Sequence, residues 1–329
     1  MASGDGPMGT AHAPERGRSA MARATAIGVS TEAATLPGAQ TRARDPHISG
    51  VVERAGGRVA WEACGAGDPP IVFVPPWQIV HSRIWKAQVP DFARRHLVVT
   101  WDARGNGRSD RPTDPAVHSA RARAGDLGAV MDAAGVDAAV LVGLSGASGP
   151  MVVFADAHPE RVLGLFFVCP SSVLGEPGPS DDVPFDEPLP DDRGWHKENL
   201  HFWRRDFQAY LEFFFGECFP EPHSTKQRED GVAYGLATDP ETLAATAHAP
   251  GLEVAEVRAM CRGITCPTVV LQGTDDRISH VTQGMGLAGA IPGARLVLAT
   301  GSGHVVNARD PVRTNLLLRE FIRGLGSTS

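Results

Sequence analysis

Short apolar runs alternate with longer amphipathic stretches along the chain from about residue 49 onward. The run at residues 71–74 contains no polar position, which is typical of a strand buried on both faces of a sheet. Comparable runs predict further strands at residues 97–101, 139–142, 163–168, 268–272 and 295–299. Residues 51–54 and 58–64 flank Gly56-Gly57 and predict an antiparallel pair around that turn.

Helices are predicted between these runs. Residues 118–134 place Leu127, Val130, Met131 and Ala134 at helical spacing. Further helices are expected at residues 81–94, 147–157 and 195–219. The last helix follows Asp310, which can cap it, and Pro311, which suits its first turn.

This alternation predicts an α/β protein with a mainly parallel central sheet and helices on both faces. It is interrupted at residues 171–262, first by a Pro- and acid-rich loop and then by an aromatic-rich helical segment. We expect one domain over residues 49–326, with a core of 49–170 and 263–326 and a helical cap of 171–262. Residues 1–48 lack apolar periodicity and are expected to be a disordered extension.

Composition narrows the class of protein. The 329 residues carry a formal net charge of −7, which argues against a nucleic-acid binder. No apolar run approaches the length of a membrane span, and the first residues lack the apolar core of a secretory signal. The five cysteines show no metal-ligand spacing. We therefore expect a cytoplasmic protein with reduced thiols and no metal.

A candidate nucleophile follows the strand at residues 139–142. In Val142-Gly143-Leu144-Ser145-Gly146-Ala147, small residues surround a serine between a strand and a helix. That pattern is typical of a nucleophile elbow, where the strained turn tolerates only small neighbours. Ser148 is an alternative nucleophile, although it would require the strand to continue through Gly146.

Two further candidates follow predicted strands near the C-terminus. Asp275 and Asp276 come after the strand at 268–272, and His304 lies in a small-residue loop after the strand at 295–299. Together with Ser145 they give the chain order Ser, Asp, His, which is the order of the triad in one common hydrolase fold. All would lie at the carboxyl edge of the parallel sheet, where sites form in such folds.

Residues 49–326 resemble the α/β-hydrolase superfamily. The resemblance rests on the elbow, on Val72-Phe73-Val74-Pro75-Pro76-Trp77, on Trp101-Asp102-Ala103-Arg104-Gly105-Asn106-Gly107-Arg108-Ser109-Asp110 and on Ala157-His158-Pro159-Glu160-Arg161-Val162. It implies that Ser145 is the nucleophile, His304 the general base and acid, and Asp276 the residue that orients His304. Asp276 is preferred to Asp275 because the family places the acid three residues after the glycine.

The resemblance also implies an oxyanion hole formed by the backbone N–H groups of Trp77 and Gly146. The segment that begins at Asp102 is then a structural turn beside the site. This sequence departs from the family pattern in three places: Pro75-Pro76 replaces a His-Gly pair, Ala147 replaces glycine, and Pro150 lies early in the elbow helix.

These roles predict a serine hydrolase that cleaves an ester, lactone or related carbonyl substrate through an acyl-enzyme, without a cofactor. The aromatic residues of the cap predict a hydrophobic or aromatic acyl substrate, and Trp203, Phe207 and Phe214 are candidates to contact it. Two alternatives remain on the same fold: a small-molecule receptor or signalling protein, and a cofactor-free non-hydrolytic member such as a C–C hydrolase, perhydrolase or lyase.

Overall fold

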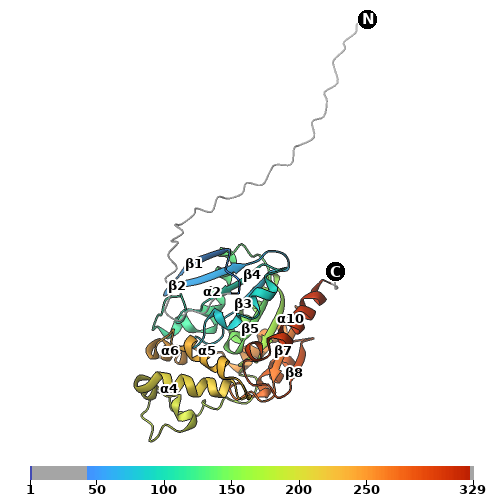
Figure 1. Ribbon diagram of the computed structural model, residues 1–329. Coiled ribbons are helices and arrows are strands. Elements are labelled where there is room, and N and C mark those ends of the chain that lie inside the picture. The colour runs from blue at the N-terminus through green and yellow to red at the C-terminus, as the bar shows by residue number, and fades with distance from the viewer. Residues whose placement is uncertain (2–42, 327–329) are drawn as a thin grey trace. The chain divides into compact units, whose positions relative to one another are not determined.

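An eight-stranded sheet forms the centre of the protein in a computed structural model that describes Met1 and residues 43–326 (Figure 1). Its strands, in chain order, are β1 (Ile48–Arg54), β2 (Gly57–Cys64), β3 (Ile71–Val74), β4 (Val98–Trp101), β5 (Ala139–Leu144), β6 (Val162–Val168), β7 (Thr268–Gly273) and β8 (Arg295–Ala299). In space they follow the order β1-β2-β4-β3-β5-β6-β7-β8.

Strand directions confirm the predicted mainly parallel sheet. β2 is antiparallel to β1 and to β4, whereas every pair from β4 to β8 in the spatial order is parallel. The antiparallel pair predicted around Gly56-Gly57 is β1 and β2. Because β3, β5, β7 and β8 are parallel, the loops after them lie at one edge of the sheet, and these loops carry the candidate site residues.

Helices cover both faces of the sheet. The α-helices are α1 (Val89–Phe92), α2 (Ala120–Ala133), α3 (Ser148–Ala157), α4 (Leu200–Cys218), α5 (Thr225–Gly235), α6 (Pro240–Ala247), α7 (Val254–Gly263), α8 (Val281–Ala290), α9 (Val306–Arg309) and α10 (Pro311–Leu325). Short 3₁₀ turns occur at Ser82–Trp85, Pro115–His118, Ser145–Ala147, Pro159–Arg161 and Gly194–Lys197.

Successive strand side chains enter two separate cores, as the pleat requires. Phe73 and Val142 join α4 and α10 in one core, and Val72 and Leu141 join α2, α3, α7 and α8 in the other. Both cores need apolar residues, which explains why the parallel strands read as continuous apolar runs. The predicted cap of Asp310 on α10 is confirmed, because its side chain accepts from the Arg313 N–H.

The single helix predicted at residues 81–94 is wrong. The chain instead forms the 3₁₀ turn at Ser82–Trp85 and the short α1. Pro90 explains the break, since proline has no N–H to donate and disfavours helical geometry in the residue before it. It is accommodated in the first turn of α1, where an intrahelical N–H is not needed.

The helix predicted at residues 195–219 is confirmed only in part. α4 begins at Leu200, where the Asn199 side chain caps it, and residues 194–197 form a separate 3₁₀ turn. At Asp206 the backbone leaves helical geometry (φ −151°), which kinks α4. Figure 1 shows α4, α5 and α6 grouped together away from β1 and β2, whereas α7 packs against α3 and α8.

Two further expectations concern the N-terminal segment and membrane-spanning helices. The disordered extension predicted at residues 1–48 falls largely outside the described residues, which resume at residue 43 before β1. None of the helices in the described part of the chain combines the length and the apolar character that crossing a bilayer requires.

Candidate active site

Ser145 occupies the tight turn between β5 and α3, and its backbone has a left-handed φ of 54°. Residues other than glycine rarely adopt this conformation, which costs on the order of 1–3 kcal/mol and is concentrated at functional sites. The turn also demands small neighbours. A Cβ at Gly143 would lie 2.3 Å from Sδ of Met151 and 2.7 Å from Cβ of Ala147. Ala147 itself is fully buried, so the methyl group that replaces the usual glycine hydrogen is accommodated.

His304 and Asp276 form a buried pair beside this turn. The His304 Nδ1 atom lies 2.9 Å from Oδ2 and 3.1 Å from Oδ1 of Asp276. The carboxylate is held by three further donors: the N–H groups of Ile278 and Ser279, each at 2.9 Å, and the Gln272 side chain at 3.1 Å. These bonds hold the Asp276 carboxylate against the Nδ1 atom of the His304 ring.

The structure separates the two alternatives left open by the sequence. Asp275 is exposed, and its carboxylate accepts a hydrogen bond from Thr274 at 2.9 Å, whereas His304 bonds to Asp276. Ser148 is the first residue of α3 and donates to the carbonyl oxygen of Ser171. Neither residue lines the cavity that contains Ser145 and His304.

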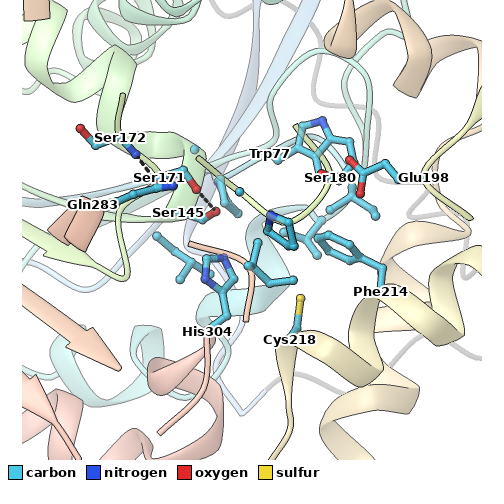
Figure 2. A pocket seen from close by; sticks show the side chains of 18 of the residues that line it. Trp77, Ser145, Ser171, Ser172, Ser180, Glu198, Phe214, Cys218, Gln283 and His304 are labelled. Atoms are coloured by element: carbon cyan, nitrogen blue, oxygen red, sulfur yellow. Dashed lines mark hydrogen bonds between the residues drawn. The ribbon is translucent and has the colours of Figure 1, made fainter. Parts of the chain in front are cut away.

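Ser145 is engaged by a second serine that the sequence analysis missed. Its Oγ lies 3.1 Å from Oγ of Ser171 (Figure 2). Oγ of Ser171 in turn lies 2.6 Å from Oγ of Ser279. Within the described residues no hydrogen bond joins Ser145 to His304, although both side chains line one cavity. Catalytic hydrogen bonds are often long in unliganded sites and tighten when substrate binds.

The backbone of Trp77 passes close to Gly146 at the elbow. A Cβ at Gly146 would lie 3.4 Å from the Trp77 nitrogen, so the loop after β3 runs directly past the start of the elbow helix. The Trp77 N–H has no acceptor among residues 43–326. The Trp77 indole is fixed by a 2.6 Å hydrogen bond to Thr246 of α6.

Arg123 of α2 connects these two loops, and it too was missed by the sequence analysis. Its buried guanidinium donates to the carbonyl oxygens of Pro75 at 2.6 Å, Pro76 at 2.7 Å and Gly146 at 3.1 Å. Burial lowers the pKa of Arg123 to about 10, so the side chain stays protonated at neutral pH. The unusual Pro75-Pro76 segment is thus held in place through its carbonyl groups.

The same contact accounts for Pro150. In a regular helix the N–H of residue 150 would donate to the carbonyl of Gly146, but proline has no N–H. Arg123 supplies the missing donor to Gly146. Pro150 and Arg123 therefore form a matched pair across α3 and α2.

The segment that begins at Asp102 is a turn, as predicted. Asp102 accepts from the N–H groups of Ser82 at 2.9 Å and Arg108 at 3.0 Å. A Cβ at Gly107 would lie 2.5 Å from Oδ2 of Asp102, which explains why this position is occupied by glycine. Arg104 forms a buried ion pair with Asp126 at 2.9 Å.

A cavity of about 620 Å³ extends from Ser145 and His304 toward the segment between β6 and β7. Of the three aromatic residues predicted to contact substrate, Phe214 lines this cavity. Trp203 and Phe207 do not; they pack in the aromatic cluster behind it, where the ring of Trp203 lies 6.3 Å from that of Trp77. Figure 2 shows Phe214 and Glu198 across the cavity from Ser145.

One group of side chains in the described chain could in principle hold a metal ion: Cys169, Asp276 and His304, whose ligand atoms lie within 4.8 Å of one another. Metal binding would require the thiolate of Cys169. Burial and the nearby Asp276 carboxylate raise the pKa of this thiol well above its ordinary value, which keeps it neutral. The cluster is therefore better suited to orienting His304 than to binding a cation.

Residues 69–311 match the family described as the alpha/beta hydrolase fold, and the chain belongs to this family. Among curated proteins it is similar to the "Putative carbamate hydrolase RutD" of Pseudomonas savastanoi pv. phaseolicola, with 27% identity over 79% of this chain and 96% of that protein. Related proteins of the same description from Caulobacter vibrioides are also 27% identical, over 73% of this chain and 85% of theirs.

Solved structures give the same class. One is Est816, described as an N-acyl homoserine lactone degrading enzyme, with a TM-score of 0.67 and 27% identity, covering 83% of this chain and 100% of that chain. Another is the esterase RhEst1 from Rhodococcus sp. ECU1013, with a TM-score of 0.69 and 26% identity, covering 84% and 98%. The protein is accordingly a hydrolase, which favours the enzymatic interpretation over the receptor alternative.

Proposed function

We propose that this hydrolase cleaves an ester, lactone or related carbonyl substrate through an acyl-enzyme on Ser145. The observation that carries the proposal is the strained φ of 54° at Ser145, in a cavity that also contains the buried His304–Asp276 pair. A serine held in this way, next to a histidine oriented by a carboxylate, is the arrangement that acyl transfer requires.

In this mechanism His304 takes the proton of the Ser145 hydroxyl as Oγ attacks the substrate carbonyl. Asp276 keeps Nδ1 of His304 protonated and stabilises the imidazolium that forms. His304 then returns the proton to the leaving group, and a water molecule activated by the same histidine releases the acyl group. These steps require the Ser145 hydroxyl to exchange its contact with Ser171 for one with His304 when substrate binds.

The oxyanion that forms in each step is assigned to the N–H groups of Trp77 and Gly146. Support comes from the close approach of the Trp77 backbone to Gly146 and from the lack of an acceptor for the Trp77 N–H within residues 43–326. Arg123 acts as a positioning residue, because it binds the carbonyl groups of both loops. Its positive charge also strengthens the local field that favours a developing negative charge.

The relatives support a carbonyl bonded to nitrogen or oxygen as the target. Their names refer to a carbamate, an N-acyl homoserine lactone and esters. The cavity has room for a small acyl substrate, and Phe214 and Trp77 give it aromatic walls. We therefore infer a hydrophobic or aromatic acyl group next to the scissile bond, and no cofactor.

The domain and cap bounds predicted from the sequence are part of this proposal. Residues 49–326 form the hydrolase domain, and the segment 171–262 is its cap, of which α4 and α6 contribute Phe214 and Thr246 to the cavity. The five cysteines are free thiols, which fits the reducing conditions of a cytoplasmic protein.

Burst kinetics with p-nitrophenyl esters test the mechanism. An acyl-enzyme on Ser145 predicts a rapid release of p-nitrophenol equal to the enzyme concentration, followed by slower turnover. Intact-protein mass spectrometry at early times should find the added acyl mass on the peptide that contains Ser145. Turnover with no burst, no acylated protein and no loss of rate in Ser145→Ala would overturn the proposal.

A further inference from the structure

The end of the cavity remote from Ser145 contains a buried carboxyl group that no step of the mechanism uses. Glu198 lines the cavity together with Ser180, and its Oε2 atom is inaccessible to solvent and has no hydrogen-bond partner among the described residues. Figure 2 shows its carboxyl group turned toward the cavity, beside Ser180. A buried acceptor without a donor is costly, on the order of 1–3 kcal/mol, and such a group calls for an explanation.

The backbone, rather than the carboxyl group, holds Glu198 in place. Its N–H donates to the carbonyl oxygen of Trp195 at 2.9 Å. The next residue, Asn199, caps α4 and also donates to the carbonyl oxygens of Pro184 at 2.8 Å and Glu187 at 2.8 Å. The hydrogen bonds of this junction therefore fix the point from which the Glu198 side chain reaches the cavity.

The surroundings of Glu198 contain no compensating charge. Burial raises the pKa of Glu198 to about 7, and the carboxylate of Asp181 adds to this effect. The nearby hydroxyl groups of Tyr210 and Ser180 partly offset this rise in the pKa. Glu198 forms no ion pair with any lysine, arginine or histidine in the part of the chain that the structure describes. On α4, Cys218 also faces this group, and its thiol is kept neutral by a raised pKa.

A purely apolar substrate would fit this end of the cavity poorly. It would displace water from Glu198 and offer the carboxyl group nothing in return. A hydroxyl or amine group at the same place would instead donate a hydrogen bond to the carboxyl group of Glu198. The aromatic walls formed by Trp195 and Phe214 would still contact the carbon chain that connects such a group to the scissile carbonyl.

We propose that Glu198 and Ser180 form a polar subsite that binds a hydrogen-bond-donating group, a hydroxyl or an amine, at the end of the substrate remote from the reacting carbonyl. This subsite rests on the proposed function, because it refers to a substrate whose carbonyl lies at Ser145. It narrows the substrate class from a plain hydrophobic acyl compound to one with a polar terminus.

Binding to the full-length Ser145→Ala protein tests the subsite without requiring turnover. The probes are ethyl hexanoate, ethyl ω-hydroxyhexanoate and ethyl ω-aminohexanoate, with longer and shorter acyl chains as a series, measured by titration calorimetry. At one chain length at least, a terminal hydroxyl or amine should tighten binding about tenfold, the effect of one good hydrogen bond. If the preference for the amino ester over the plain ester grows as pH rises through 7, the substrate terminus is cationic. If the hydroxy ester is preferred and this preference does not rise with pH, the terminus is neutral.

The variant Glu198→Leu in the same background should abolish the preference, and Glu212→Leu should retain it. Glu212 is the matched control because it lies exposed on α4, bonded to Gln208 and outside the cavity. Melting temperatures establish that each variant is folded. Donor-bearing esters that bind no better than plain ones at every chain length, or a preference that survives Glu198→Leu, would overturn the subsite. Failure of the acyl-enzyme on Ser145 would leave these binding results unchanged, so the two proposals fail separately.

Discussion

The guanidinium of Arg123 lies 3.1 Å from the carbonyl oxygen of Gly146, and it donates to that oxygen the hydrogen bond that Pro150 cannot make. The same side chain binds both proline carbonyls of the loop that precedes Trp77. One residue on α2 thus connects the two backbone segments to which the oxyanion hole is assigned. Arg123 therefore fixes the position of these two segments relative to each other.

Replacing Arg123 by lysine should lower kcat about 10- to 100-fold with a smaller change in KM. A lysine ammonium is a single point donor and cannot serve three carbonyl groups in the geometry of a guanidinium, so the donors assigned to the oxyanion would lose their alignment. Steady-state kinetics on a p-nitrophenyl ester measure the effect. Arg121→Lys is the control, since Arg121 is exposed on the same helix and pairs with Glu256. A kcat for Arg123→Lys equal to that of the parent would refute the positioning role.

Asp276→Asn should lower kcat on the order of 10³- to 10⁴-fold, because an amide cannot hold His304 in the required tautomer or stabilise its protonated form. The neighbouring Asp275→Asn provides a matched comparison, since Asp275 is exposed and bonded to Thr274. Its kcat should change less than about twofold, because His304 bonds to Asp276 and not to Asp275. Equal losses in the two variants would mean that the acid is wrongly assigned.

Gly143→Ala should destabilise the protein by about 1–3 kcal/mol, the usual effect of overpacking. The new methyl group would overlap Sδ of Met151, 2.3 Å away, and Cβ of Ala147. Gly289→Ala is the control: it lies in α8, and no atom would lie within 4 Å of its Cβ. That change should stabilise the protein slightly, since alanine favours helices. Urea unfolding of both variants measures the difference, and a Gly143→Ala protein as stable as the parent contradicts the steric account of the elbow.

Glu198 should make the folded protein less stable as pH rises. Its pKa of about 7 in the folded state exceeds the ordinary glutamate value of 4.5, which applies to the unfolded chain. Folding therefore favours the protonated form. The contribution of protonated Glu198 to the free energy of unfolding is therefore complete below pH 4.5 and is lost as pH rises through 7. Urea unfolding at a series of pH values between these limits should show a steeper decline for the parent than for Glu198→Gln. Glu212→Gln should follow the parent, and parallel curves for all three proteins would exclude the raised pKa.

Much of the fold was predictable because it depends on local patterns. Buried parallel strands produce continuous apolar runs, and the elbow at Ser145 requires small residues at neighbouring positions in the sequence. The helix predicted at residues 81–94 does not form as one element because Pro90 interrupts it. α4 begins at Leu200 rather than at Trp195, because the Asn199 side chain caps the helix there.

The residues that hold the loops of the site and line its cavity were not predictable in the same way. Arg123 and Pro75 are 48 residues apart, and an arginine in an amphipathic helix gives no sign that it will be buried against a proline loop. For the aromatic residues, composition alone could not distinguish the face of α4 that meets the cavity from the one that meets other rings. Phe214 lies on the former, and Trp203 and Phe207 lie on the latter.

Labelling with a fluorophosphonate probe tests the central claim most directly. The probe reacts with a serine only when its hydroxyl is activated, so the account predicts rapid labelling of the parent protein at Ser145. Labelling should disappear in Ser145→Ala and fall sharply in His304→Ala, while Ser148→Ala should still react. A folded parent protein that does not react, or a Ser145→Ala variant that is labelled as well as the parent, would contradict the assignment of Ser145 as the nucleophile.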